Sequence, residues 1–280
     1  MQLQLPRNRI LSLASPVVMG ILNTTPDSFS DGGRFTHVDV AVQHGLQMRD
    51  DGARIIDVGG ESTRPGAPHV SLDDELARVI PVIEALRAAD PEVVISIDTS
   101  KTVVMAEAIA AGADFINDVR ALQEPGALQL AAQLQVPVCL KHMQGQPKTM
   151  QVSPHYNDVS QDVLAWLGKR ASECEAAGIH PQQIILDPGF GFGKTLEQNY
   201  QLLQQFHCFV DSGYAVLAGM SRKSMIGNLL ARDASQRLAG SLACATIAAM
   251  QGAHIIRVHD VKETADVLNI VSATKLGVSE

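Results

Sequence analysis

The sequence contains only four cysteines, and their positions match neither a metal site nor a disulfide framework. Cys139, Cys174, Cys208 and Cys244 form no CxxC pair and show no Cys/His spacing typical of zinc ligands. This absence excludes a zinc-binding fold and a disulfide-stapled secreted fold, and it favours a reducing compartment.

Long apolar runs and excess positive charge are missing too. No stretch approaches the roughly 18 apolar residues of a membrane span, and the opening MQLQLPRNRI lacks the basic and apolar segments of a secretion signal. We therefore expect a cytoplasmic protein without a membrane partner. The formal net charge of -8 offers no electrostatic footprint for nucleic acid. A small anionic ligand held by local basic residues remains possible.

Short aliphatic runs alternate along the whole chain with longer segments of helical spacing. Apolar residues make up 46% of the sequence and charged residues 19%, a composition typical of a globular core. The expected strands cover 17–22, 54–59, 93–98, 115–118, 136–141, 183–187, 215–219 and 254–259. The expected helices include 38–52, 72–89 and 160–178.

This rhythm predicts a parallel sheet with helices on its outer side. Nearly continuous aliphatic strands are typical of parallel strands that are covered on both faces. No linker rich in Pro, Gly or Ser divides the sequence, so we expect a single domain over residues 1–280. Eight units favour a (β/α)8 barrel, and an open doubly wound sheet is the alternative.

A barrel places its chemistry after the carboxyl ends of the strands. The expected strands end in polar side chains, which are Asn23, Asp98, Asn117, Asp118, Lys141, His142, Asp187, Arg257 and His259. Any one of them can be an ordinary turn residue, but a polar end on so many strands indicates an active face.

Basic residues and buried acids suggest two parts of one site. Arg222, Lys223, Arg257 and His259 follow the last two strands, where barrels often bind phosphate, so we expect an anionic, phosphorylated ligand. Asp187 and Asn117 together have the donors and acceptors to read the N–H edge of a flat heterocycle. The alternative for Asp98 and Asp187 is a structural ion pair with Arg or Lys.

Several motifs together resemble one enzyme family. GILNTTPDSFSDGGRF, DVGGESTRPGA, SIDTSK, FINDV, HMQG, ILDPGFGFGKT, SRKS and RVHDV occur in the order in which dihydropteroate synthases carry their motifs. The resemblance runs from about Val17 to Val261. It implies a (β/α)8 barrel, usually a homodimer, that condenses 6-hydroxymethyl-7,8-dihydropterin diphosphate with 4-aminobenzoate, assisted by magnesium.

The resemblance also implies roles for individual residues. The pterin pocket falls on Asp98, Asn117, Asp187, Gly219, Lys223 and Arg257. Asp187 is expected to hold the amino-pyrimidine edge with support from Asn117, while Arg257 stacks on the ring. The diphosphate falls on Asn23, Arg257 and His259, with Asn23 also a magnesium ligand.

The second substrate and the chemistry fall on neighbouring residues. The family's aminobenzoate site corresponds to Phe29, Thr63, Arg64, Pro65, Phe192, Lys223 and Ser224. The expected catalytic residues are Asp98, Lys223 and Arg257, because a diphosphate leaving group calls for electrostatic stabilisation rather than a nucleophilic side chain.

Two rival functions and one departure from the family remain. The rivals are a barrel of the methyltetrahydrofolate methyltransferase type and a non-catalytic pterin-binding barrel. The departure is Lys141, before HMQG, where the family carries a Met that packs on the pterin ring. We expect Lys141 to face the pterin pocket, with its stem covering apolar surface. The alternative is that strand alternation turns Lys141 away from the pocket.

Overall fold

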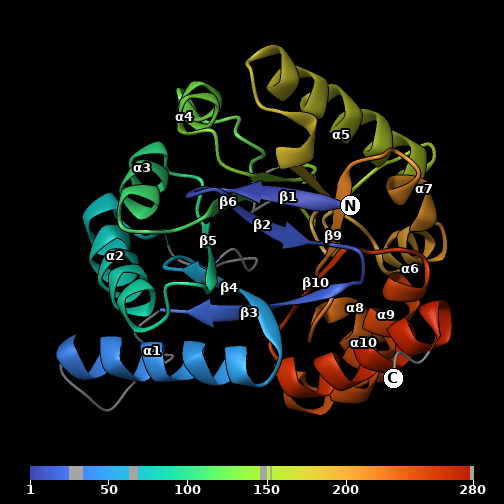
Figure 1. The fold of residues 1–280 in the computed structure, drawn as a ribbon. Coiled ribbons are helices and arrows are strands. Elements are labelled where there is room, and N and C mark those ends of the chain that lie inside the picture. Colours follow the sequence, from blue (N-terminus) through green and yellow to red (C-terminus); the bar gives the residue numbers. More distant parts are fainter. Residues whose placement is uncertain (25–33, 63–68, 146–149, 152, 278–280) are drawn as a thin grey trace.

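Eight parallel strands form a closed barrel in the computed structural model, which describes residues 1–24, 34–62, 69–145, 150, 151 and 153–277 (Figure 1). The barrel strands in spatial order are β10 (Ile255–Val258), β3 (Val17–Asn23), β4 (Ala53–Gly59), β5 (Val94–Asp98), β6 (Phe115–Asp118), β7 (Val138–Lys141), β8 (Ile184–Asp187) and β9 (Ala215–Ala218). All eight strands predicted from the sequence are present. The closed sheet confirms the (β/α)8 barrel and excludes the open doubly wound sheet.

Helices surround the barrel, as Figure 1 shows. They are α1 (Arg34–Asp50), α2 (Leu72–Ala89), α3 (Thr102–Ala110), α4 (Ala127–Leu134), α5 (Val159–Ala176), α6 (Leu196–Gln204), α7 (His207–Val210), α8 (Ser224–Leu230), α9 (Leu238–Met250) and α10 (Val261–Leu276). Local sequence sets several of their starts. Ser71 caps α2 through the amide of Asp74, and Thr195 forms a capping box with Gln198 on α6. No helix in these ranges is long and apolar enough to cross a membrane.

An antiparallel hairpin precedes the barrel and was not predicted. It pairs β1 (Gln2–Leu5) with β2 (Arg9–Ser12), and its leucines pack on the interior of the barrel. The hairpin is fastened by Asp114, whose carboxylate lies fully buried and accepts ion pairs from Arg7, Arg9 and Arg87. The polar–apolar alternation of QLQL was the available signal for this strand.

The barrel wall separates two apolar regions. Outward-facing strand residues pack against the helices, whereas Ile55, Phe115, Cys139, Ile185 and Ile255 form a separate inner core with the hairpin. Side chains alternate between the two faces of a strand. The residue two positions beyond each of these five therefore also points into the barrel, nearer the carboxyl ends of the strands.

Candidate active site

Polar side chains replace the inner core at the carboxyl end of the barrel. Two positions beyond the five inner apolar residues lie Asp57, Asn117, Lys141, Asp187 and Arg257. The strand register carries Asp98 into the same layer, because it pairs with Gly59 on one side and Asn117 on the other. Four of the predicted pterin residues, Asp98, Asn117, Asp187 and Arg257, are thus brought together by alternation and register.

Arg257 links the carboxylates on one side of this layer. Its Nε lies 2.6 Å from Oδ2 of Asp57, and its Nη2 lies 2.7 Å from Oδ2 of Asp98. The Asn117 amide donates to Asp57 at 3.1 Å, and the Ser96 hydroxyl donates to Asp57 as well. Burial alone lowers the pKa of the guanidinium, but Asp57 and Asp98 outweigh it, so the pKa of Arg257 is raised.

Asp57 was missed when the sequence was read for site residues. It is fully buried, and burial raises its pKa while the neighbouring Arg257 opposes the rise. An acid inside an aliphatic strand, in phase with the inward-facing Ile55, was the signal that would have found it. Its position under Arg257 and Asn117 makes it the residue that orients both.

Asn117 carries an unused acceptor. Its side-chain carbonyl oxygen is buried and has no hydrogen-bond partner among the described residues. Such an oxygen costs free energy unless a donor reaches it. Because the Nδ2 side of the amide is held by Asp57, the free oxygen is available to an N–H group of a ligand.

Asp187 lies on the other side of the layer, next to Lys141. One of its oxygens accepts from the Gly189 amide at 2.8 Å, and the other lies 3.7 Å from Nζ of Lys141. The Lys141 side chain is buried and faces the barrel interior, in phase with Cys139. The alternative that strand alternation turns Lys141 outward is therefore wrong. Asp98 and Asp187 do form ion pairs, but with Arg257 and Lys141 of the same layer.

Two lysine amines contact the ring of Phe192. Nζ of Lys223 lies 4.7 Å and Nζ of Lys141 lies 5.3 Å from the ring centroid. Lys223 also donates to the Phe190 carbonyl at 2.6 Å. Burial lowers the pKa of Lys223 to about 7; Asp187 opposes this shift, and Lys141 and Arg257 add to it.

The loop after β8 is held by a third lysine. Nζ of Lys194 lies 3.0 Å from Nδ1 of His142 and donates to the carbonyls of Gly189 and Phe192. Burial lowers the pKa of Lys194 to about 7, with Asp187 opposing. Burial and Lys194 also lower the pKa of His142 to about 2, so His142 acts as a neutral structural partner. Lys194 was not predicted as a functional residue.

The remaining predicted residues lie around this layer. Gly219 follows β9, where a Cβ would lie 3.8 Å from that of Arg257. His259 contacts the Ser221 hydroxyl at 3.0 Å, and Asn23 ends β3 opposite Gly59. Ser224 begins α8 and is exposed. Phe29, Thr63, Arg64 and Pro65 lie outside the described residues.

Arg222 does not join the basic cluster as the sequence suggested. It forms a two-point ion pair with Asp260 and is well exposed. Its positive φ of 57° reflects the tight turn after β9. The carboxylate of Asp260 neutralises the Arg222 guanidinium. The positive charge at the mouth of the barrel therefore comes from the other predicted basic residues.

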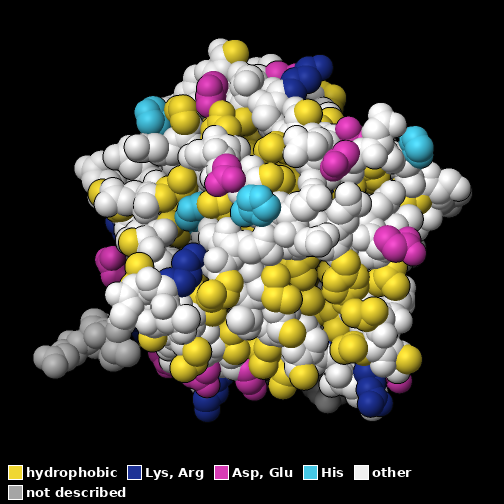
Figure 2. Space-filling model, turned by 90° about the vertical axis from the view of Figure 1, so that its right-hand side faces the viewer, with side chains coloured by type: hydrophobic (Ala, Val, Ile, Leu, Met, Phe, Trp, Pro, Cys, Tyr) yellow, Lys and Arg dark blue, Asp and Glu magenta, His cyan; other side chains and the backbone are white. Residues whose placement is uncertain are grey.

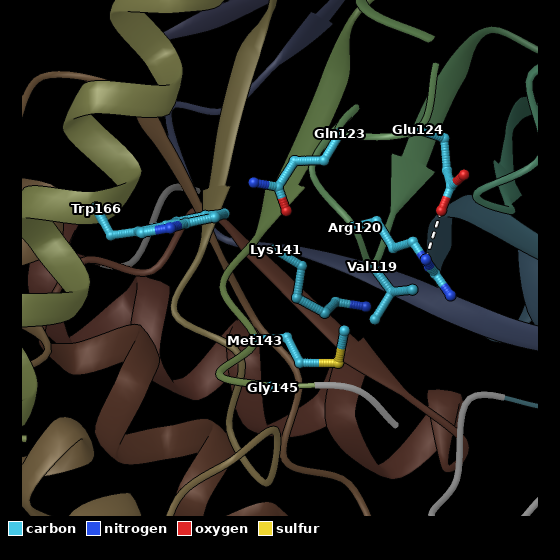
Figure 3. A pocket seen from close by; sticks show the side chains of 8 residues that line it. All are labelled: Val119, Arg120, Gln123, Glu124, Lys141, Met143, Gly145 and Trp166. Atoms are coloured by element: carbon cyan, nitrogen blue, oxygen red, sulfur yellow. Dashed lines mark hydrogen bonds and ion pairs between the residues drawn. The ribbon is translucent and has the colours of Figure 1, made fainter. Parts of the chain in front are cut away.

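A small cavity of about 180 Å³ adjoins this layer beside Lys141. It is lined by Val119, Arg120, Gln123, Glu124, Lys141, Met143, Gly145 and Trp166 (Figure 3). In the figure the Lys141 side chain extends past Met143 toward Val119, and Arg120 forms an ion pair with Glu124. The space gives the flexible stem of Lys141 room to change its position.

The chain and its barrel fold match known proteins closely. The family model for pterin binding enzymes matches residues 19–259. Dihydropteroate synthase of Escherichia coli strain K12 is 58% identical over 264 residues, which cover 94% of this chain and 93% of that protein. The Yersinia pestis dihydropteroate synthase structure with a sulfonamide drug is 55% identical, with a TM-score of 0.92, and the match covers 98% of this chain and 99% of that one.

A third relative was solved with 7,8-dihydropteroate bound. Dihydropteroate synthase of Xanthomonas albilineans in complex with 7,8-dihydropteroate is 46% identical, with a TM-score of 0.89 and 99% coverage of both chains. The chain therefore belongs to the family of pterin binding enzymes. Within that family it belongs with the dihydropteroate synthases, because it matches its relatives over nearly their full length.

Proposed function

We propose that this chain condenses 6-hydroxymethyl-7,8-dihydropterin diphosphate with 4-aminobenzoate, giving 7,8-dihydropteroate and diphosphate. The observation that carries the proposal is the inward layer that contains Asp98, Asn117, Asp187 and Arg257, with Lys223 beside it, in a chain so similar to dihydropteroate synthases. The layer combines acceptors for a heterocycle with cations for an anion.

The acids and amide hold the pterin. Asp187 accepts from the amino-pyrimidine edge, and the free oxygen of Asn117 accepts a further N–H of the ring. Gly219 leaves space beside Arg257, whose guanidinium stacks on the ring. Asp57 takes no part in substrate contact but orients Asn117 and Arg257.

The reaction proceeds by displacement of diphosphate at the pterin methylene. The C–O bond to the diphosphate breaks, the amine nitrogen of 4-aminobenzoate forms the new C–N bond, and the nitrogen releases one proton. Asp98 stabilises positive charge that develops at the methylene. Lys223, Arg257 and His259 stabilise the departing diphosphate, so electrostatics and positioning supply the catalysis.

Magnesium fits this scheme as an ion that arrives with the diphosphate. In the described part of the chain no group of three or more His, Cys, Asp or Glu side chains can hold a metal. Mg²⁺ commonly takes few protein ligands and completes its shell with substrate phosphates and water. The side-chain oxygen of Asn23 would be the protein ligand of the ion, which would supply positive charge beside the leaving group.

The aminobenzoate binds where the apolar ring of Phe192 meets Lys223. Lys223 and Ser224 provide polar groups beside that ring, and Phe29, Thr63, Arg64 and Pro65 complete the site in this proposal.

The protein is proposed to act in the cytoplasm, because a reducing compartment fits the four cysteines, which are all free.

The working protein is proposed to be a homodimer. Exposed apolar side chains gather on α8, α9 and α10, namely Leu229, Leu230, Leu238, Ile247, Met250, Ile270 and Leu276, and we call this set the helical patch. Figure 2 shows hydrophobic side chains gathered on the lower part of the face that these helices belong to. A second copy of the chain is the partner that would cover such a surface.

One assay separates the proposal from its rivals. The purified protein is incubated with dihydropterin diphosphate and Mg²⁺, with and without 4-aminobenzoate, and both diphosphate and dihydropteroate are measured. We expect equal amounts of both products, only when 4-aminobenzoate is present. Pterin binding without product identifies a binding barrel. Methyl transfer from methyltetrahydrofolate in a parallel assay identifies the methyltransferase type.

A further inference from the structure

We propose that Lys141 makes the pocket selective for the anionic, diphosphate-bearing form of its pterin ligand. This inference rests on the proposed function and assigns Lys141 as an additional specificity residue. Lys141 is a buried lysine that has no role in the reaction scheme described above.

Lys141 contributes to the balance of charge in the inner layer. Three carboxylates lie in the inner layer, those of Asp57, Asp98 and Asp187. Among the described residues, Lys141, Lys223 and Arg257 lie beside them. A nearby fourth amine, on Lys194, is held by His142 and two carbonyls of its own loop. Removal of the charge on Lys141 leaves the layer with more acids than cations.

The position of the Lys141 amine lets its charge act on Asp187 without a direct hydrogen bond. The Lys141 amine lies 3.7 Å from Asp187, beyond ordinary hydrogen-bond distance, and its side chain is only 4% exposed. It shares the Phe192 ring with Lys223, the cation assigned to both substrates. A charge in such a poorly solvated layer acts over several ångströms, because little water screens it. Lys141 therefore offsets Asp187 when an anion enters.

The pterin ligands with and without diphosphate differ in charge. A neutral 6-hydroxymethylpterin meets the same acceptors on Asp187 and Asn117 but has little use for an extra cation. A pterin diphosphate brings several negative charges up to Arg257, in a layer that already holds three acids. The benefit of Lys141 is therefore largest for the diphosphate, and the adjoining cavity lets its stem adapt to the ring.

Titration calorimetry with both ligands tests the proposal. It compares the full-length protein with Lys141→Met, which keeps an apolar stem and removes the charge. Lys169→Met is the matched control, because Lys169 is exposed on α5 and the change in net charge is the same. In Lys141→Met we expect about tenfold weaker binding of pterin diphosphate and at most about twofold change for 6-hydroxymethylpterin.

Salt dependence and a charge-retaining variant complete the test. Binding of the diphosphate should depend less on ionic strength in Lys141→Met than in the parent, and Lys141→Arg should retain the parent's preference. If Lys141→Met does not fold, Lys141→Gln serves the same comparison. Equal changes for both ligands, or no change, overturn the role of Lys141. Failure of the unmodified protein to bind either pterin overturns the proposed function instead.

Discussion

Two carboxylates share Arg257 but have different surroundings. Asp57 lies fully buried and also accepts from Ser96 and Asn117. Asp98 contacts Nη2 of Arg257 at the end of β5, nearer the mouth. In the proposed reaction Asp57 therefore supports the site, whereas Asp98 meets the substrate. Substitution separates these roles.

Asp98→Asn should abolish turnover without loss of the fold. The amide keeps the size of the side chain but removes the charge that stabilises the pterin methylene, so we expect kcat/KM to fall by at least about 100-fold. The same loss is expected for Asp187→Asn. Thermal unfolding followed by circular dichroism should remain cooperative. Loss of the cooperative transition together with activity assigns the altered Asp a structural role.

Asp57→Asn should instead reduce stability. It leaves the half-buried Arg257 with one carboxylate partner fewer, and removal of one member of a largely buried ion pair costs roughly 3 kcal/mol. Urea unfolding at constant m-value measures the difference. A free energy of unfolding equal to that of the parent contradicts this role for Asp57.

The lowered pKa of Lys223 predicts that substrate binding depends on pH. Burial lowers its pKa to about 7, so the amine of the empty pocket is protonated below this pH and neutral above it. Only the protonated amine attracts diphosphate, so affinity for pterin diphosphate should fall as the pH rises through about 7. Calorimetry across this range measures the fall, which Lys223→Met should eliminate. A fall that persists in Lys223→Met points to Lys194, whose pKa is also lowered to about 7.

At the scale of the element, the loop between β8 and α6 determines the shape of the pocket. Gly189 has a φ of +71°, and a Cβ there would lie 1.9 Å from the His142 carbonyl oxygen. A Cβ on Gly193 would lie 2.6 Å from the Gln144 carbonyl oxygen. These approaches let Lys194 reach the loop carbonyls and hold Phe192 in position beside Lys141 and Lys223.

Gly189→Ala should destabilise the loop and weaken pterin binding. The backbone conformation and the contact with His142 both disfavour a side chain, with a cost of at least about 2 kcal/mol in unfolding free energy. Gly168→Ala is the matched control, because Gly168 lies in α5 and a Cβ there meets nothing within 4 Å. A helical Gly→Ala change should stabilise by about 0.5–1 kcal/mol. Equal melting temperatures of the two variants contradict the prediction.

At the scale of the whole molecule, charge and apolar surface are divided between different regions. The chain has a net charge of -8, yet buried cations lie at the barrel mouth. The helical patch lies on α8, α9 and α10, and α8 follows directly from Lys223. A dimer formed through this patch would support the helix that carries Ser224.

Ile247→Lys should convert the proposed dimer to a monomer. Ile247 is 44% exposed on α9 within the helical patch, and a charge buried at an interface is costly. Val103→Lys on α3 is the control, because Val103 is 48% exposed and lies outside the patch. Sedimentation velocity should give a dimer for the parent and the control but a monomer for Ile247→Lys. A dimer in all three proteins excludes this surface as the interface.

The sequence by itself determined the barrel and most of the inner layer. Aliphatic runs report burial on both faces of parallel strands, and polar residues at their carboxyl ends report the active face, because both signals are local. Asp98, Asn117, Asp187 and Arg257 were found in this way. Lys223 was found as one of the basic residues that follow the last two strands, and the family motifs added Gly219.

Only the tertiary structure decided how these residues are paired. Closure of the barrel brings Arg257 on β10 beside Asp57 on β4 and Asp98 on β5, contacts that span 200 and 159 residues of sequence. Local patterns carry no information on such separations. Pairing of the consecutive strands β7 and β8 places Lys141 beside Asp187, and the segments after the paired strands β9 and β10 bring Arg222 to Asp260. The sequence gives the charge of a side chain, but its ion-pair partner depends on which strands become neighbours in the folded barrel.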